Sequence, residues 1–224
     1  MKDARRPPGS FAVLRRAGRS RLVLAAGMPR SGSTMLFNIV RLCLEQNYPG
    51  QLSAGWIGEI HRLPPAPVWL LKVHTVPRLL AWRANAIFCS FRDVRDALVS
   101  AQRKFGAEPS LERCREYVRE DQAARAYADC RLRYEELTAQ PESAIEQVGR
   151  ALAVPVDVAQ VLRQLPHPDA RAPASGYDRT TLLHPNHATR TVAGDWRQVL
   201  PPELQVRIAE EFADWLRANG YPLA

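Results

Sequence analysis

A chain of 224 residues is long enough for one well-buried core and short of the length at which a second independent core becomes common. Its 46% hydrophobic and 24% charged residues exclude an intrinsically disordered chain. The 31 basic and 23 acidic residues leave a net charge of +8, which favours anionic partners. We predict one globular domain over residues 21–224, preceded by a basic N-terminal tail over residues 1–20.

The cysteines and the apolar runs indicate the compartment. None of the four cysteines belongs to a C-x-x-C pair, the spacing that metal and redox sites use, so we expect free thiols. The basic N-terminus lacks the apolar stretch of a signal peptide, and no later run has the length of a membrane span. These features predict a soluble cytoplasmic protein without a membrane partner.

In the first half of the chain, short apolar runs alternate with segments whose apolar residues recur at the spacing of a helix. The run Arg21–Gly27 predicts a buried strand, and the pattern that follows predicts a helix from Ser33 to just before Tyr48. Two further apolar runs bounded by polar residues, Val68–Val73 and Ala86–Ser90, predict buried strands.

The second half is predicted to be mainly helical, with loop in the proline-rich stretch 154–188. The whole pattern predicts a single-domain α/β fold with a central, mostly parallel sheet flanked by helices on both faces. The expected elements are a helix over Leu111–Tyr127 with Ser110 as N-cap, a strand over Arg131–Tyr134, helices over Ser143–Leu152 and Val158–Leu165, and one last helix between Pro201-Pro202 and Asn219-Gly220.

The turn after the first strand has a phosphate-binding pattern. Gly27 and Gly32 form the G-x-x-x-x-G frame of a P-loop, and Thr34 supplies its terminal hydroxyl. Ser33 occupies the place of the usual lysine, whereas a cation comes three residues earlier, at Arg30. Backbone N–H groups of such a loop converge on an anion at the helix N-terminus. For this motif alone, an ordinary tight turn is the alternative.

A second arginine follows the strand Ala86–Ser90. Arg92 leaves the strand end, and Ser100 lies two turns into the next helix. Asp93 and Asp96 would repel a phosphate unless they cap the helix or pair with arginine, so we expect structural roles for both.

The two motifs together resemble those of the PAPS-dependent sulfotransferases. In that family a P-K/R-S-G-T/S-T loop holds the 5′-phosphosulfate of 3′-phosphoadenosine 5′-phosphosulfate (PAPS), and a Y/F-R-D-P-R-D-x-x-x-S stretch binds its 3′-phosphate. Val94 replaces the proline of the second motif. The resemblance covers roughly residues 21–220 and implies the P-loop-like sulfotransferase architecture. The nucleotide ligands that it implies are Arg30, Ser31, Gly32, Ser33, Thr34, Arg92 and Ser100.

The end of the strand Val68–Val73 carries the candidate catalytic residues. Alternation directs Lys72 and His74 to the same side of the strand. The segment resembles the family's K-x-H, which implies His74 as general base and Lys72 with Arg30 as the cations that meet charge on the leaving phosphate oxygen. Some relatives use a glutamate as base, and Glu59 and His61 are the nearest alternatives here, ranked below His74. This scheme requires no metal.

Two C-terminal stretches are also similar to the family. Tyr134, in R-Y-E-E-L, corresponds to a strand-end tyrosine near the adenine, and Gly194–Arg197 matches a G-D-W-K/R segment. Many members close the 3′-phosphate site with an R-K-G tripeptide, whereas residues 189–191 are T-R-T here and leave Arg190 as the phosphate ligand.

The resemblance implies transfer of the sulfuryl group of PAPS to a hydroxyl or amine of a small-molecule or carbohydrate acceptor, with PAP as the nucleotide product. We expect the acceptor beside Gln51–Pro67 and Leu165–Pro185. A P-loop nucleotide kinase-like phosphotransferase is the main alternative. A nucleic-acid-binding module is less favoured, because zinc-finger spacings and aromatic-studded basic strands are missing. The sequence points to no particular acceptor and to no oligomeric state.

Overall fold

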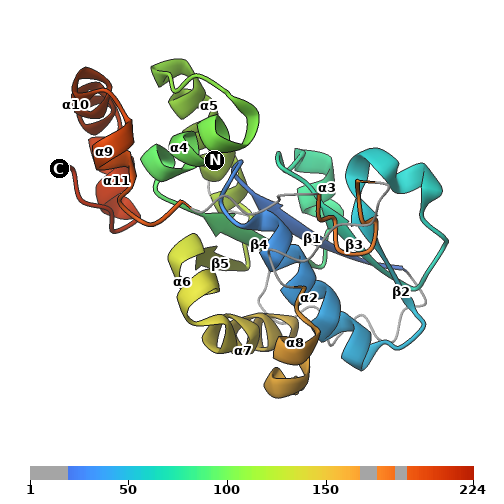
Figure 1. Cartoon of the computed structure of the whole chain (residues 1–224). Coiled ribbons are helices and arrows are strands. Elements are labelled where there is room, and N and C mark those ends of the chain that lie inside the picture. The colour runs from blue at the N-terminus through green and yellow to red at the C-terminus, as the bar shows by residue number, and fades with distance from the viewer. Residues whose placement is uncertain (1–19, 167–175, 185–190) are drawn as a thin grey trace.

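The computed structural model of the chain describes residues 20–166, 176–184 and 191–224. Within these residues, five parallel strands form one sheet between two layers of helices (Figure 1), which confirms the predicted α/β architecture. The strand order β2-β3-β1-β4-β5 places the first strand at the centre. The strands are β1 (Arg21–Gly27), β2 (Leu52–Trp56), β3 (Val68–Lys72), β4 (Ala86–Phe91) and β5 (Cys130–Arg133).

One face of the sheet packs against helices α2 (Ser33–Asn47), α6 (Tyr134–Ala139), α7 (Pro141–Leu152) and α8 (Val158–Gln164). The other face packs against α3 (Arg78–Arg83) and α5 (Leu111–Arg125). The remaining helices gather beside α5 in a lobe at one side of the molecule (Figure 1). They are α4 (Val94–Phe105), α9 (Trp196–Val199), α10 (Pro202–Glu211) and α11 (Ala213–Ala218).

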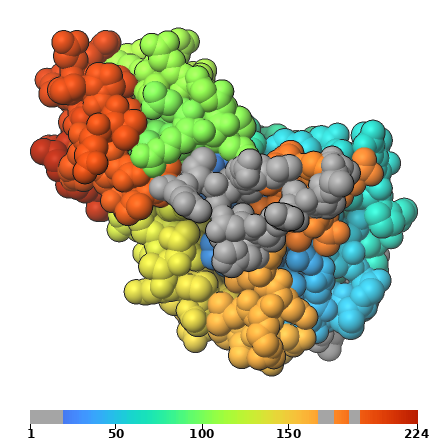
Figure 2. All heavy atoms as spheres, in the orientation of Figure 1, coloured from blue at the N-terminus to red at the C-terminus, as the bar shows by residue number. Residues whose placement is uncertain are grey.

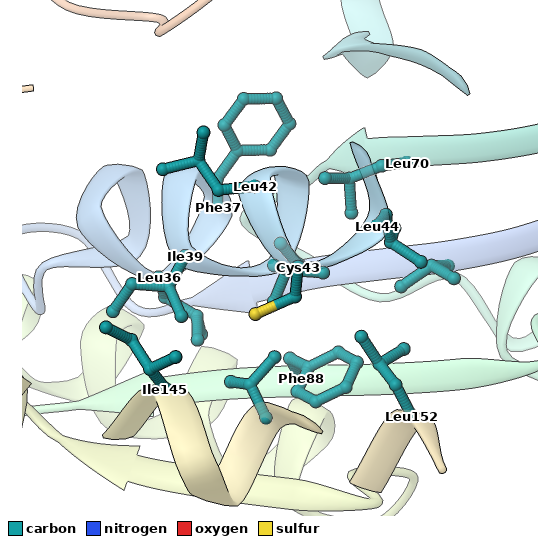
Figure 3. Close-up of a cluster of buried hydrophobic side chains, with 14 of the residues drawn as sticks. Leu36, Phe37, Ile39, Leu42, Cys43, Leu44, Leu70, Phe88, Ile145 and Leu152 are labelled. Carbon is teal, nitrogen blue, oxygen red and sulfur yellow. The ribbon is translucent and has the colours of Figure 1, made fainter. Parts of the chain in front are cut away.

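Helix α2 lies over the middle of the sheet, and its apolar side chains make most of the contact (Figure 3). Leu36, Ile39 and Cys43 lie close to Phe88 of β4 and Ile145 of α7. Each fully buried side chain of this size contributes about 1.5–3 kcal/mol to stability. Because strand β1 has a helical layer on both sides, its residues are buried regardless of the face to which they point.

Most of the predicted elements are confirmed to within two residues, including β1, α2 and the Ser110 cap of α5, where the Ser110 hydroxyl accepts a bond from Arg113 N–H. The single last helix is wrong: the helical hydrogen bonding is interrupted at Phe212, where φ is −112°, and two helices result. Five of the described elements were not predicted: β2, an edge strand whose burial alternates, the 3-10 helix η2 (Ile57–Arg62) and the short helices α3, α6 and α9. The four cysteine thiols are free, as expected.

The carboxyl ends of β1, β3, β4 and β5 meet at one edge of the sheet. After β1 the chain passes to β2 and β3 on one side of it, and then crosses to β4 on the other side. In open α/β sheets the crevice at such a reversal of strand order is where ligands bind. The fold therefore directs attention to the loops that follow these four strands.

Candidate active site

A cavity of about 630 Å³ lies at this edge of the sheet. Its walls come from the β1–α2 loop, the ends of β3 and β4, the first residue of α6 and the segment 176–184. Figure 2 shows this segment, in orange, against the cyan residues that follow β2. The cavity brings together nine of the predicted site residues: Arg30, Gly32, Ser33, Thr34, Lys72, His74, Arg92, Ser100 and Tyr134.

The start of α2 has the geometry of an anion cradle. Gly32 caps the helix with φ of 78°, no side chain caps its free N–H groups, and no acidic residue occupies its first turn. These N–H groups and the helix dipole favour a bound anion. The Ser31 hydroxyl points away from the cavity, since it donates to Met28 O at 2.7 Å and lies 2.8 Å from Ser90 Oγ. Ser31 therefore stabilises the loop through hydrogen bonds on the side that faces away from the cavity.

Neighbouring side chains lie so close to Gly27 and Gly32 that neither position has room for a Cβ atom. A Cβ added to Gly27 would lie 2.3 Å from Ser90 Oγ, and one added to Gly32 would lie 2.9 Å from the Tyr134 ring. The left-handed φ of Gly32 is itself unfavourable for other residues. Arg30 also has a positive φ, of 64°, a conformation that costs a non-glycine residue roughly 1–2 kcal/mol. The loop therefore holds a strained shape at the cavity.

Arg92 joins the second motif to the first. Its guanidinium is 1% exposed, donates to Thr191 O at 3.1 Å and to Arg30 O at 3.5 Å, and stacks 3.9 Å above the Tyr134 ring. Among the described residues it forms no ion pair, and its Nε has no hydrogen-bond partner. A buried cation without a counterion is costly, so this geometry favours an anionic ligand.

Arg30 lies beside the same space and reaches across to α4. Its Nε donates to Ser100 Oγ at 2.9 Å. Burial, and secondly the charge of Arg92, lowers the pKa of Arg30. An anion placed between Arg30 and Arg92 would stabilise the charged form of Arg30 against both effects.

Lys72 and His74 face the cavity together, as their alternation predicts. Burial, and secondly the charge of Arg30, lowers the pKa of Lys72 to about 8. Burial and the charge of Lys72 lower the pKa of His74, against the opposing effect of a bond to Gly27 O. His74 Nδ1 lies 3.1 Å from that carbonyl oxygen, which can only accept, so Nδ1 carries the proton and Nε2 has the free lone pair.

The two aspartates of the second motif have the structural roles expected of them. Asp93 caps α4 through a bond from Arg95 N–H and forms a buried ion pair with the Arg95 guanidinium at 2.7 Å. Asp96 accepts bonds from Gly194 N–H at 2.8 Å and Trp196 N–H at 3.1 Å. Asp96 therefore fixes the end of the C-terminal segment that supplies Thr191 O to Arg92.

The wall opposite the cradle is apolar and aromatic. It includes Trp56 and Tyr177, both in the segments predicted to meet the acceptor, and also Glu59. Arg190 lies outside the described residues. Leu182, Leu183 and His184 also line the cavity and belong to the predicted acceptor-side segment Leu165–Pro185. Four further lining residues lie outside the predicted motifs and acceptor-side segments, since nothing in their local pattern marks them: Met35, Asn38, Phe105 and Thr138.

Comparison with known proteins decides the fold family. No family model and no curated protein matches the sequence. Among solved structures, the mouse sulfotransferase SULT7A1 complexed with PAP aligns over 93% of this chain and 90% of its own, with a TM-score of 0.61 and 13% identity. The chain has the sulfotransferase fold.

Two complexes of retinol dehydratase share the sulfotransferase fold. The complex with androsterone and inactive cofactor PAP aligns over 92% of this chain and 85% of its own, with a TM-score of 0.63 and 14% identity. The complex with retinol and PAP covers 88% and 82%, with a TM-score of 0.61 and 14% identity.

Within the described part of this sulfotransferase fold, no group of three or more His, Cys, Asp or Glu side chains is arranged to hold a metal ion. None of its described helices combines the length and the apolar character that crossing a bilayer demands.

Proposed function

We propose that the chain transfers the sulfuryl group of PAPS to a hydroxyl or amine of a small acceptor. The observation that carries the proposal is that the anion cradle and Arg92, from motifs about sixty residues apart, share one cavity with His74. A nucleotide with anionic groups at two positions matches this pair of sites. The three similar structures contain PAP, the product that PAPS leaves after transfer.

The residues present fit such a nucleotide. Arg92, with its unpartnered Nε, and Ser100 would hold the 3′-phosphate, and Tyr134 would lie near the adenine. The free N–H groups at the start of α2, with Ser33 and Thr34, would hold the 5′-phosphosulfate. When bound there, PAPS supplies an activated sulfuryl group and a phosphate leaving group.

In the mechanism His74 and two cations have separate tasks. His74 Nε2 accepts the proton of the acceptor hydroxyl, while the Nδ1 bond to Gly27 O keeps the ring in that tautomer. With the nucleotide bound, Lys72 and Arg30 would be the cations that meet negative charge on its leaving phosphate oxygen, as in other in-line group transfers. Lys72 also lies 5.4 Å from the Trp56 ring centroid, a cation–π contact that orients the ammonium.

The acceptor class follows from the opposite wall. Trp56, Tyr177 and Leu183 offer apolar and aromatic surface next to His74, whose ring centroid is 5.3 Å from that of Trp56. Such a wall suits an alcohol or phenol on an apolar skeleton better than a highly polar carbohydrate. Retinol and androsterone, present in the similar structures, are molecules of this kind.

Titration calorimetry with PAP tests the proposal against the kinase-like alternative. We expect PAP to bind in the presence of EDTA and to displace ATP, because the cavity offers a separate cation for the 3′-phosphate that ATP lacks. A nucleotide kinase would instead bind ATP with Mg²⁺ more tightly than PAP. Tighter binding of Mg²⁺-ATP would refute sulfuryl transfer as the function.

The pH dependence of kcat/KM for PAPS should be bell-shaped. It should rise through the His74 pKa, which lies below 6.5, because only the neutral imidazole accepts a proton. It should fall above about pH 8, where the Lys72 ammonium loses its proton. The fall in kcat should come at higher pH, because bound anionic PAPS raises the Lys72 pKa. Lys72→Arg should move the alkaline limb up by more than one pH unit, and an unchanged limb would contradict the assignment.

A further inference from the structure

The segment 176–184 is a self-bonded turn. Asp178 Oδ1 accepts bonds from Thr180 N–H at 2.8 Å and Thr181 N–H at 3.1 Å, and Asp178 O accepts one from Leu182 N–H at 2.7 Å. Leu182 is buried with φ of 58°, a strained conformation for leucine that needs support from its surroundings. This turn carries four side chains of the cavity wall: Tyr177, Leu182, Leu183 and His184.

Asn38 of α2 attaches this turn to the helix that begins at the anion cradle. Its Nδ2 donates to Thr181 O at 2.7 Å and to Thr34 O, one helical turn back, at 2.9 Å. Its Oδ1 accepts from Arg41 Nε and Nη2, both at 3.3 Å, which fixes the orientation of the amide. Asn38 is 1% exposed, so these bonds are sheltered from water.

We infer that Asn38 is a positioning residue, which holds the acceptor-side wall at a fixed distance from the phosphosulfate cradle. The inference rests on the proposed function and extends it. Thr34 lines the cradle and Thr181 lies in the turn that carries the wall residues, and one amide group bonds to the backbone of both. In-line transfer requires the acceptor oxygen and the donor to meet within a fraction of an ångström, and a shift of 1 Å can cost about 100-fold in rate.

Helix α2 provides a matched control at its other end. Asn47 Nδ2 donates to Cys43 O, one turn back, at 2.9 Å, and to Pro155 O of another segment, also at 2.9 Å. This pattern repeats that of Asn38, but neither Asn47 nor Pro155 lines the cavity. Asn38→Ala and Asn47→Ala therefore each remove two side-chain bonds to backbone carbonyls from the same helix, and only those of Asn38 connect the helix to the wall. Asn38→Ala also removes the bonds that Asn38 Oδ1 accepts from Arg41.

The test compares the parent chain with the two variants in three measurements. In Asn38→Ala, kcat/KM for 4-nitrophenol should fall about tenfold or more, the Kd for PAP should change less than twofold, and amide hydrogen exchange at residues 178–182 should quicken about tenfold. In Asn47→Ala the kinetics and the exchange of 178–182 should match the parent. Thermal unfolding of both variants checks that the fold is kept.

The outcomes separate this inference from the proposed function. Equal effects of the two variants on acceptor kinetics, or unchanged exchange at 178–182 in Asn38→Ala, would overturn the role of Asn38. A loss of PAP affinity as large as the loss of acceptor efficiency would also overturn it, because Asn38 would then merely stabilise α2. A parent chain that binds no PAP would refute the proposed function instead, while hydrogen exchange would still decide whether Asn38 tethers the wall.

Discussion

Arg92→Met is expected to weaken PAP binding by about 100-fold or more. Methionine keeps much of the side-chain volume above Tyr134 but removes the buried charge and its donors. Loss of one partner from a buried, hydrogen-bonded charge pair costs about 2–5 kcal/mol, and 1.4 kcal/mol corresponds to tenfold in affinity. Titration calorimetry with PAP measures the change directly.

The same substitution should leave the stability of the ligand-free chain unchanged or raise it. Arg92 forms no ion pair among the described residues, so until an anion binds its charge is offset only by two carbonyl acceptors, the Tyr134 ring and the more distant charges of Asp96 and Asp195. A purely structural arginine would behave in the opposite way, with loss of stability and no specific effect on PAP. Arg115→Met is the control, because Arg115 pairs with Glu211 on the surface and does not line the cavity. Unchanged PAP affinity in Arg92→Met would refute the assignment of the 3′-phosphate site.

The phosphate-facing half of the cavity could be predicted because its chemistry is local in sequence. A strand that ends at Gly27, a glycine with left-handed φ at Gly32 and a helix that starts at Ser33 together dictate a cradle of N–H groups. Arg92 likewise follows directly from the end of a buried strand. Since carboxyl ends of parallel strands share one edge, the meeting of the two motifs follows from the predicted sheet.

The acceptor-facing half could not be predicted, because it depends on contacts distant in sequence. Asn38 and Thr181 are 143 positions apart in the sequence. No periodic pattern of apolar residues marks the turn at 178–182 that Thr181 belongs to. The edge strand β2, which ends at Trp56 just before Glu59, contains three consecutive small residues, Ser53-Ala54-Gly55, and resembles loop in composition. The position of such a wall depends on how loop segments pack against the rest of the fold, and the local sequence of a loop does not predict that packing.

His74→Ala is expected to lower kcat for transfer to 4-nitrophenol by about 100-fold to 10,000-fold, the range for removal of a general base. The Kd for PAP should change less than threefold, because the His74 ring bonds to Gly27 O and takes no part in the cradle. The substitution should also abolish the acid limb of the kcat/KM profile, since that limb reports the imidazole. Steady-state rates and calorimetry on the same preparation separate the two effects.

Glu59→Gln distinguishes His74 from the alternative base. Glu59 lines the cavity but is partly exposed and forms an ion pair with Arg62 at 3.3 Å, so its carboxylate is already partly neutralised. His74 packs against Trp56, with ring centroids 5.3 Å apart, and its Nε2 keeps a free lone pair because Nδ1 bonds to Gly27 O. A general base needs a free lone pair close to the acceptor oxygen, and within the described cavity His74 offers Nε2 beside Lys72, with a lowered pKa that keeps the imidazole neutral. A kcat loss in Glu59→Gln that exceeds the loss in His74→Ala would assign the base to the carboxylate.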